Sequence, residues 1–274
     1  MQITIVVSSL SSGGAERVAA NLAEGLSLRG HAVTLFTKAR SGSDDYSVPP
    51  EVVLREIPRV GGGGSLPGRL RAGKKRRRLL RSAILCTEPD VVIPFTTPVN
   101  VRVLLALAGC TVPVVLTEHN HPSRSATTLR YRVLRRWKYS KASLLVSVSQ
   151  GVDRGFAPYL PQSQRAVIHN SLPRDVETML SQEPEVFLKD GDSWFAACGR
   201  LIEQKVFDQL LQAFAAADVP GWKLVILGEG PERAALTAQA EALGIAHRLY
   251  LPGRVQNPFA VLRQAEVFVL SSRW

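Results

Sequence analysis

The chain has 274 residues, of which 45% are hydrophobic and 21% charged, and its formal net charge is +11. This composition is typical of a globular protein with real cores, and the length allows two domains of ordinary size. The three cysteines, Cys86, Cys110 and Cys198, are far apart and odd in number. This spacing excludes a disulfide framework or a metal site and favours buried thiols in a reducing, cytoplasmic compartment.

The N-terminal segment is predicted to be a strand rather than a secretion signal. Residues 1–10 are apolar, carry no basic residue and run directly into a glycine-containing turn and a helical pattern. The closest candidate for a membrane span, residues 99–117, is interrupted by Arg102, Gly109 and Pro113. Since a spanning helix needs about 18 apolar residues or more, the sequence predicts none.

Short apolar segments alternate with helical patterns along the whole chain. The segments are rich in β-branched residues and nearly continuous in apolar character, as strands buried on both faces should be. Between them, apolar residues recur three and four positions apart, as in Val18, Leu22 and Leu26, which is the pattern of a helix packed on a sheet. Such alternation predicts parallel sheets with helices on both sides. The predicted strands are 3–8, 32–36, 52–57, 91–95, 114–117, 144–149, 165–168, 194–198, 223–227, 249–251 and 267–270.

This alternating pattern occurs twice, which predicts an α/β chain with two doubly wound, Rossmann-like domains. The first series ends near residue 168, a polar stretch with Pro173 and Pro184 follows, and a new strand begins at Trp194. We therefore predict a first domain at 1–170, a hinge at 171–191 and a second domain at 192–274. The second domain is expected to be incomplete, because four strands fit where such a half usually has five or six. Residues 61–64, all glycine, are predicted to form a flexible loop.

Basic residues are concentrated in two segments. Residues 59–81 hold nine Lys and Arg and residues 124–141 hold seven, both without an acidic residue, so the rest of the chain is mildly acidic. The first segment is predicted to be a helix with Leu70, Leu79 and Leu80 among its bases. In the second, Leu129, Val133, Leu134 and Trp137 form an apolar stripe flanked by Arg130, Arg132, Arg135 and Arg136. These segments suit an anionic partner, or they are solvated faces with the stripe packed on the first domain's sheet.

Two loops of the first domain carry candidate binding residues, because the carboxyl ends of parallel strands line the ligand crevice. Gly13 and Gly14 precede a helix whose N-terminus favours an anion, although two adjacent glycines also suit a plain tight turn. His119 lies with His121 in a polar cluster that suits either loop capping or a binding site.

Three loops of the second domain carry further candidates. Arg200 and Lys205, with Lys205 in the first turn of a helix, can converge on one anion such as a departing diphosphate; the alternative is a pair of surface cations. The glycines around Glu229 keep the next turn open, and Pro231 fits the first position of the helix that follows. Gly253 lies in a third crevice loop.

Taken in this order, the segments resemble the GT-B glycosyltransferases, specifically glycosyltransferase family 4. Each segment is modest alone, but the ordered set is specific and spans essentially the whole chain. It consists of Gly13-Gly14-Ala15-Glu16-Arg17, Glu118-His119-Asn120, Val148-Ser149 with Gly151, His169-Asn170, Gly199-Arg200-Leu201 with Lys205, Leu227-Gly228-Glu229-Gly230-Pro231, Gly253 and Leu270-Ser271-Ser272.

The resemblance implies a retaining transferase that needs no catalytic metal or other cofactor and has two domains facing a cleft. The first domain would lie on the acceptor side and the second would bind a nucleotide-diphosphate sugar as co-substrate. His119 would contact the donor sugar, while Arg200 and Lys205 would hold the diphosphate. The implied catalytic residues are His119, Arg200 and Lys205, and the implied donor-binding residues are Gly13, Gly14, Arg200, Lys205, Gly228, Glu229, Arg254 and Val255.

The chain departs from the family pattern in two places. Val206 stands where a glycine usually follows the lysine, which could crowd the start of the helix. The two glutamates that the family places after the Ser-Arg-Trp stretch, and the C-terminal helix, are not in this sequence. We therefore expect a C-terminally truncated member.

The basic segments fit an acceptor role, because acceptors in such families are often lipid-linked sugars at the inner leaflet. We expect a cytoplasmic, peripheral transferase of cell-surface polysaccharide or glycolipid synthesis, with no nucleic-acid partner. Alternatives are a remnant that binds donor without turnover, a nucleotide-sugar epimerase, and a nucleic-acid-binding module. The predicted membrane or acceptor contacts are Lys74, Lys75, Arg76, Arg77, Arg78, Arg132, Arg135 and Arg136.

Overall fold

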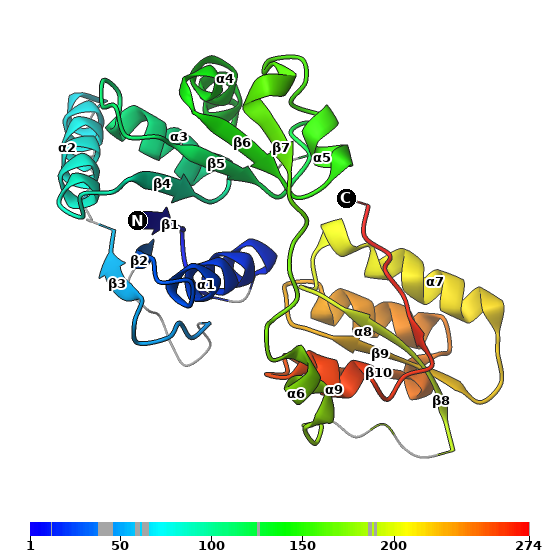
Figure 1. Ribbon diagram of the computed structural model, residues 1–274. Helices are drawn as coiled ribbons and strands as arrows, with labels where there is room; N and C mark the ends of the chain where they lie inside the picture. Colours follow the sequence, from blue (N-terminus) through cyan, green and yellow to red (C-terminus); the bar gives the residue numbers. More distant parts are fainter. Residues whose placement is uncertain are drawn as a thin grey trace. The chain divides into compact units, whose positions relative to one another are not determined.

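The computed structural model consists of two compact units, Met1–Ser171 and Leu172–Trp274 (Figure 1). It describes residues 1–11, 13–37, 46–57, 61, 66–124, 127–185, 188 and 191–273. Most of the predicted glycine loop at 61–64, together with Arg59 and the side chain of Leu70, lies outside the described residues.

The first unit is built on parallel strands. Four of them form a sheet in the order β3-β2-β1-β4, and three more follow in the order β5-β6-β7. Parallel bridges between Val92 and Val114 and between Phe95 and Thr117 join β4 to β5, so all seven strands form one continuous surface. The strands are β1 (Gln2–Val6), β2 (Ala32–Thr37), β3 (Val53–Glu56), β4 (Val91–Pro94), β5 (Val115–Glu118), β6 (Leu144–Ser147) and β7 (Arg165–Val167).

Helices cover both faces of these strands, because apolar residues of the strands project to both sides. One core lies under α1, where the small residues Ala19, Ala20 and Ala23 let the helix approach the sheet closely. The other core lies under α2 to α5 and includes Ile84 and Phe156. The helical elements are α1 (Gly14–Ser27), α2 (Leu66–Leu85), α3 (Thr97–Ala106), α4 (Leu129–Lys138), η1 (Tyr139–Lys141), α5 (Gln150–Arg154) and η2 (Gln162–Gln164).

The second unit repeats this design on a smaller scale. Its four parallel strands have the order β10-β9-β8-β11, and two apolar cores lie on the two faces. The elements are α6 (Val176–Ser181), β8 (Ser193–Cys198), η3 (Glu203–Lys205), α7 (Phe207–Ala217), β9 (Trp222–Leu227), α8 (Arg233–Ala242), η4 (Ala246–Arg248), β10 (Leu249–Gly253), α9 (Pro258–Leu262) and β11 (Val267–Phe268). The α/β class with two Rossmann-like units is therefore confirmed.

Each of the eleven predicted strands is present, with ends that differ from the predicted ones by at most two residues. The prediction that all strands are buried on both faces is wrong for the edge strands β3 and β11, where Phe268 is 54% exposed. In the described part of the chain, no helix has both the length and the apolar character that crossing a membrane requires.

The segment predicted as a hinge contains α6, which the sequence analysis did not predict. Asn257, at the N-cap of α9, donates its side-chain amide to Met179 O at 2.7 Å and to Gln182 Oε1 at 2.9 Å. Glu185 accepts hydrogen bonds from the backbone N–H groups of Gln256 and Asn257. These bonds hold α6 against α9 and make it part of the second unit.

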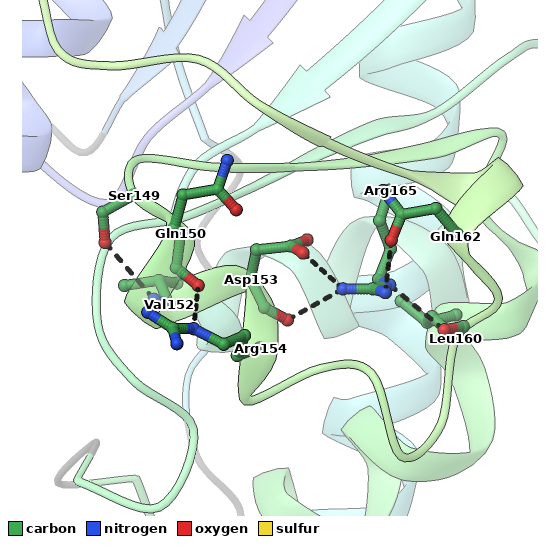
Figure 2. A network of polar contacts seen from close by, with 8 residues as sticks. All are labelled: Ser149, Gln150, Val152, Asp153, Arg154, Leu160, Gln162 and Arg165. Carbon is green, nitrogen blue, oxygen red and sulfur yellow. Dashed lines mark hydrogen bonds and ion pairs between the residues drawn. The ribbon is translucent and has the colours of Figure 1, made fainter.

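A buried ion pair joins α5 to β7 in the first unit (Figure 2). The guanidinium of Arg165 binds the Asp153 carboxylate, and it also donates to Asp153 O at 3.0 Å, Leu160 O at 3.1 Å and Gln162 Oε1 at 2.7 Å. Because the donors of Arg165 are spread over these four acceptors, the pair fixes the loop that leads from α5 to β7.

Candidate functional site

Each unit has one point where the order of its strands reverses, and ligands of doubly wound folds bind at such points. In the first unit the reversal lies between β1 and β4, so the loops after Val6 and Pro94 adjoin there. In the second unit it lies between β8 and β11, next to the loops after Cys198 and Phe268. The predicted site residues can be placed relative to these two points.

The glycine turn after β1 leads into α1, with Gly13 as its N-cap and Gly14 as its first residue. The Glu16 side chain folds back over Gly13, since a Cβ placed on Gly13 would lie 2.1 Å from Glu16 Oε2. A Cβ on Gly14 would meet no described atom within 4 Å. Open space therefore adjoins Gly14, as a ligand approaching the helix start requires.

His119 follows β5 and stacks on Phe95, which follows β4, with 5.4 Å between the ring centroids. Burial lowers the pKa of His119 from 6.5 to about 4, so the imidazole is neutral at pH 7. Its Nε2 atom is buried and has no hydrogen-bond partner among the described residues. A neutral ring with a free nitrogen can hydrogen-bond a hydroxyl group of a ligand, but it cannot supply a positive charge.

Two features beside His119 were not predicted from the sequence. Thr96, the N-cap of α3, has φ 71° and ψ 151°, a backbone conformation that β-branched residues rarely adopt. Glu118 is 2% exposed and accepts hydrogen bonds from the side chains of Thr97, Asn100 and Tyr139. The sequence contained a signal for buried Glu118, because a carboxylate stands at the end of an apolar strand. Nothing in the sequence indicated the backbone conformation of Thr96.

Three loops of the second unit interlock through their glycines. A Cβ on Gly228 would lie 2.0 Å from Gly199 O, and one on Gly230 would lie 2.3 Å from Leu201 O. The backbone N–H of Leu201 donates to Glu229 O at 3.0 Å, and that of Gly228 donates to Gly253 O at 2.7 Å. Only glycine permits this close approach, so the ends of β8, β9 and β10 form one rigid backbone surface.

Arg200 and Lys205 both adjoin Gly199. Arg200 follows it in sequence and is exposed, and a Cβ on Gly199 would lie 2.8 Å from Lys205 Cε. Ser271 donates to Lys205 O at 2.7 Å, which ties this turn to the segment after β11. Contrary to the prediction, Lys205 is not in the first turn of a helix: it ends the short 3₁₀ turn η3, just before α7. Whether the two cations converge on one anion stays a prediction.

Val206, the departure from the family pattern, is the N-cap of α7 and lies in the left-handed region at φ 56° and ψ 37°. Glycine adopts this conformation freely, whereas a β-branched residue is strained in it. The glycine that the family resemblance implies at this position would be free of this strain. The side chain of Val206 is only 3% exposed, so its burial offsets part of the strain.

The strain at Val206 predicts an unusual order of stability between two variants. Val206→Ala and Val206→Gly lose nearly the same buried side chain, but only the glycine variant relieves the backbone. We expect Val206→Gly to be more stable than Val206→Ala by about 1 kcal/mol, the reverse of the order inside a helix. Urea unfolding of the two proteins measures this difference, and a more stable alanine variant would contradict the assigned conformation.

Glu229 is held by Arg233, whose guanidinium donates to both carboxylate oxygens at 2.7–3.0 Å. These hydrogen bonds lower the pKa of Glu229. Arg233 also donates to Leu251 O, and a Cβ on Gly253 would lie 3.5 Å from both side chains. Glu229 therefore adjoins the loop with Arg254 and Val255, where Arg254 is exposed and Val255 half-buried. The predicted place of Pro231 is wrong, because α8 begins two residues later at Arg233.

The two basic segments form α2 and α4. Lys74, Lys75, Arg76, Arg77 and Arg78 are exposed on α2, and Arg132 and Arg136 are exposed on α4. Arg135 contradicts its predicted surface role: it is 5% exposed, donates to Pro122 O at 3.0 Å and lies over the Phe156 ring. It is a core residue, because on α4 its side chain is directed toward Pro122 and Phe156.

The apolar stripe on α4 is mostly exposed. Leu129, Val133 and Trp137 face outward, with Trp137 69% exposed, whereas Leu134 packs on the core. The alternative that the stripe packs on the sheet is therefore wrong for three of its four residues. Helix α4 instead presents an apolar ridge beside exposed arginines.

Solved structures share the fold. The chain aligns with sucrose-phosphate synthase from Thermosynechococcus elongatus with a TM-score of 0.78 at 14% identity, over 100% of this chain and 76% of that one. It aligns with Anabaena HepE in complex with UDP-glucose with a TM-score of 0.70 at 16% identity, over 98% of this chain and 73% of that one.

Two curated relatives with glycosyltransferase names match along nearly the whole chain. One is the GalNAc-alpha-(1->4)-GalNAc-alpha-(1->3)-diNAcBac-PP-undecaprenol alpha-1,4-N-acetyl-D-galactosaminyltransferase of Campylobacter jejuni, 27% identical over 99% of this chain and 73% of that protein. Another is the amylovoran biosynthesis glycosyltransferase AmsD of Erwinia amylovora, 26% identical over 100% of this chain and 75% of that protein. This chain thus spans about three quarters of their length.

Two family models together match nearly all of the chain. Residues 181–274 match the glycosyl transferases group 1, and residues 12–175 match glycosyltransferase family 4. With the ordered motifs and the two Rossmann-like units in place, these matches show that the chain belongs to glycosyltransferase family 4.

Proposed function

We propose that this protein transfers a sugar, with retention of configuration, from a nucleotide-diphosphate sugar to a saccharide or lipid-linked acceptor in cell-surface polysaccharide or glycolipid synthesis. The observation that carries this proposal is the interlocked backbone at the ends of β8, β9 and β10, with Arg200 and Lys205 both beside Gly199. The names of the two curated relatives support a polysaccharide or lipid-linked product. The HepE complex supports a nucleotide-sugar donor.

In this proposal the second unit binds the nucleotide and stabilises the leaving group. When the bond between the sugar carbon and the diphosphate oxygen breaks, the electron pair goes to that oxygen and the diphosphate gains negative charge. Arg200 and Lys205 offset this charge. Their electrostatic attraction to the diphosphate is strongest in the transition state, where the negative charge develops. The closely packed backbone at Gly228 lets the phosphates approach, while Glu229, Arg254 and Val255 contact the nucleoside.

The first unit, in turn, holds the sugar at its own strand-order reversal. His119 is neutral and has a free Nε2, which suits a hydrogen bond to a sugar hydroxyl. Gly14 leaves room for the donor phosphates or the reacting centre at the start of α1, beside Gly13, over which the Glu16 side chain folds. The acceptor hydroxyl oxygen attacks the sugar carbon on the face that the diphosphate leaves, as retention requires, and its proton passes to the departing diphosphate oxygen.

A methyl group at Gly14 tests this proposal. The Gly14→Ala variant should fold as well as the wild type, because no described atom lies within 4 Å of the new Cβ. The methyl group would occupy space that the ligand needs, and such overpacking costs roughly 1–3 kcal/mol. We expect donor affinity and turnover to fall about tenfold or more. Calorimetry with UDP-glucose and other nucleotide sugars, together with a transfer assay, measures both.

The matched control is Gly25→Ala in the same helix, where a Cβ also meets no described atom within 4 Å. It should leave donor binding unchanged. Wild-type binding without turnover would support a remnant that has kept only the donor site. Epimer formation without an acceptor would support an isomerase, and unchanged turnover in Gly14→Ala would contradict the assigned site.

The exposed ridge of α4 and the basic face of α2 support docking on an anionic membrane at the cytoplasmic face. Helix α3 contacts both α2 and α4, so the three helices lie on the same side of the sheet. Apolar and aromatic side chains flanked by arginines are the features of helices that lie in a membrane interface. This surface would bring the enzyme to a lipid-linked acceptor.

Replacing Trp137 should weaken this docking. Burial of a large apolar side chain contributes roughly 1.5–3 kcal/mol, so we expect Trp137→Ala to bind phosphatidylglycerol-containing vesicles about tenfold more weakly. Co-sedimentation measures the binding. Leu28→Ala, at an exposed position next to α1, serves as the control and should bind like the wild type. Equal binding of Trp137→Ala and the wild type would exclude the ridge from the contact.

A further inference from the structure

A buried polar cluster is centred on the residue that precedes His119, and the proposed chemistry does not use it. Its centre is Glu118, the last residue of β5. One oxygen of this carboxyl group accepts hydrogen bonds from Thr97 Oγ1 at 2.7 Å, Asn100 Nδ2 at 3.1 Å and the Tyr139 hydroxyl. These donors come from α3 and η1, so one side chain ties three elements together.

The side chains of the cluster are almost completely buried, and this burial bears on the role of the cluster. Glu118 is 2% exposed, Tyr139 1% and Asn100 0%. Burial raises the pKa of Glu118, although its hydrogen bonds and the nearby Arg135 guanidinium act in the opposite direction. Apolar side chains of similar size would fill such a space at least as favourably. A polar cluster in this place therefore suggests a task other than stability.

The cluster connects the ends of β4 and β5 at the candidate site of the first unit. Thr97 directly follows Thr96, the residue with the strained backbone, and Thr96 N and Asn100 Nδ2 both donate to Thr117 O. His119 directly follows Glu118, and its ring stacks on Phe95. The ends of β4 and β5 are thus joined through the cluster, immediately before the residues that project from them.

We propose that Glu118 is a positioning residue: it locks the ends of β4 and β5 so that His119 and Thr96 meet the transferred sugar in one fixed geometry. The inference rests on the proposed function, since it assumes that a sugar binds there. Neither residue needs Glu118 for its own chemistry. Both depend on it for their place, because Thr97, Asn100 and Tyr139 all donate to Glu118 at the end of β5, and Thr97 directly follows Thr96.

The experiment follows the imidazole of His119 by ¹⁵N NMR in the free protein, with the signal assigned by a His119→Asn variant. In the wild type, His119 should titrate with a pKa of about 4. In Glu118→Ala we expect this pKa to rise toward the ordinary value of 6.5, because the ring is no longer held in its buried position. Glu118→Gln keeps the accepting oxygen and should restore the low pKa.

A purely structural role would not produce this pattern. Thr4→Val removes another hydrogen bond of the same unit, between Thr4 and Thr87, which is not part of the Glu118 cluster. It should leave the pKa of His119 unchanged. If Glu118→Ala does not fold, Tyr139→Phe removes one donor only and should produce a smaller rise.

The inference is overturned if the pKa of His119 in Glu118→Ala and in Tyr139→Phe equals that of the wild type. It is also overturned if Thr4→Val raises this pKa as much as Glu118→Ala does. Addition of UDP-glucose to the wild type tests the proposed function separately. A His119 signal that does not respond to the donor would count against sugar binding, while the readings in the free protein would still decide the role of Glu118.

Discussion

Replacing Arg200 and Lys205 together by alanine should weaken the binding of nucleotide-diphosphate sugars about 100-fold or more. Hydrogen bonds to charged groups contribute roughly 1.5–3 kcal/mol each, so the loss of both cations removes about 3 kcal/mol or more. Neither side chain supports the core, since Arg200 is exposed and Lys205 is half-buried along Gly199. Isothermal titration calorimetry at physiological salt measures the loss without the contribution of long-range charge.

Two variants separate a specific contact from a general effect of charge. Arg200→Lys keeps the charge but not the planar fork of donors, so donor affinity should fall to an intermediate value. Arg263→Ala removes an exposed cation at the end of α9 and should have no effect. Unchanged donor affinity in the double variant would refute the diphosphate site assigned to the second unit.

The second large effect concerns the ion pair of Figure 2. Asp153→Ala leaves the guanidinium of Arg165 buried without its carboxylate, with 7% of that side chain exposed. Removing one partner of a buried pair typically costs about 3–5 kcal/mol. We expect the free energy of unfolding to fall by this amount, as measured by urea unfolding followed by circular dichroism.

Comparison with a second ion pair shows the importance of burial. Asp192 and Lys223 also form a pair, but their side chains are 24% and 29% exposed. Asp192→Ala should therefore cost no more than about 1 kcal/mol. Asp153→Asn retains a hydrogen-bond acceptor and should lie between the two. A loss below 1 kcal/mol in Asp153→Ala would mean that the interior around Arg165 is far more polar than its burial indicates.

The sequence was sufficient to predict the strands and the loops that follow them. Strands of a parallel sheet are short, apolar and separated by helical segments, and this pattern is independent of which strands pair. Gly228 and Gly230 are predicted to keep a turn open, and the structure shows that close backbone contact requires glycine at both positions. Such local features can be read one element at a time.

Features that depend on neighbours distant in the sequence could not be predicted. The repeat of Arg130, Arg132, Arg135 and Arg136 does not reveal that Arg135 alone faces the core, because the direction of a helix face is set by its packing. Thr96 has its unusual backbone next to Thr97, whose hydroxyl donates to Glu118, 21 residues further along the chain. Lys205 lies outside α7 because the next residue, Val206, has a left-handed backbone conformation and α7 begins only after it.

The hydrogen bonds that attach α6 to α9 have a practical consequence for recombinant work on the second unit. A fragment cut at residue 192 would discard Met179, Gln182 and Glu185 and leave Asn257 without those partners. A fragment that starts at residue 172 would keep them. Isolated nucleotide-binding studies should therefore use the longer fragment, since the shorter one exposes an apolar face of α9 at the end of the loop expected to hold the nucleoside.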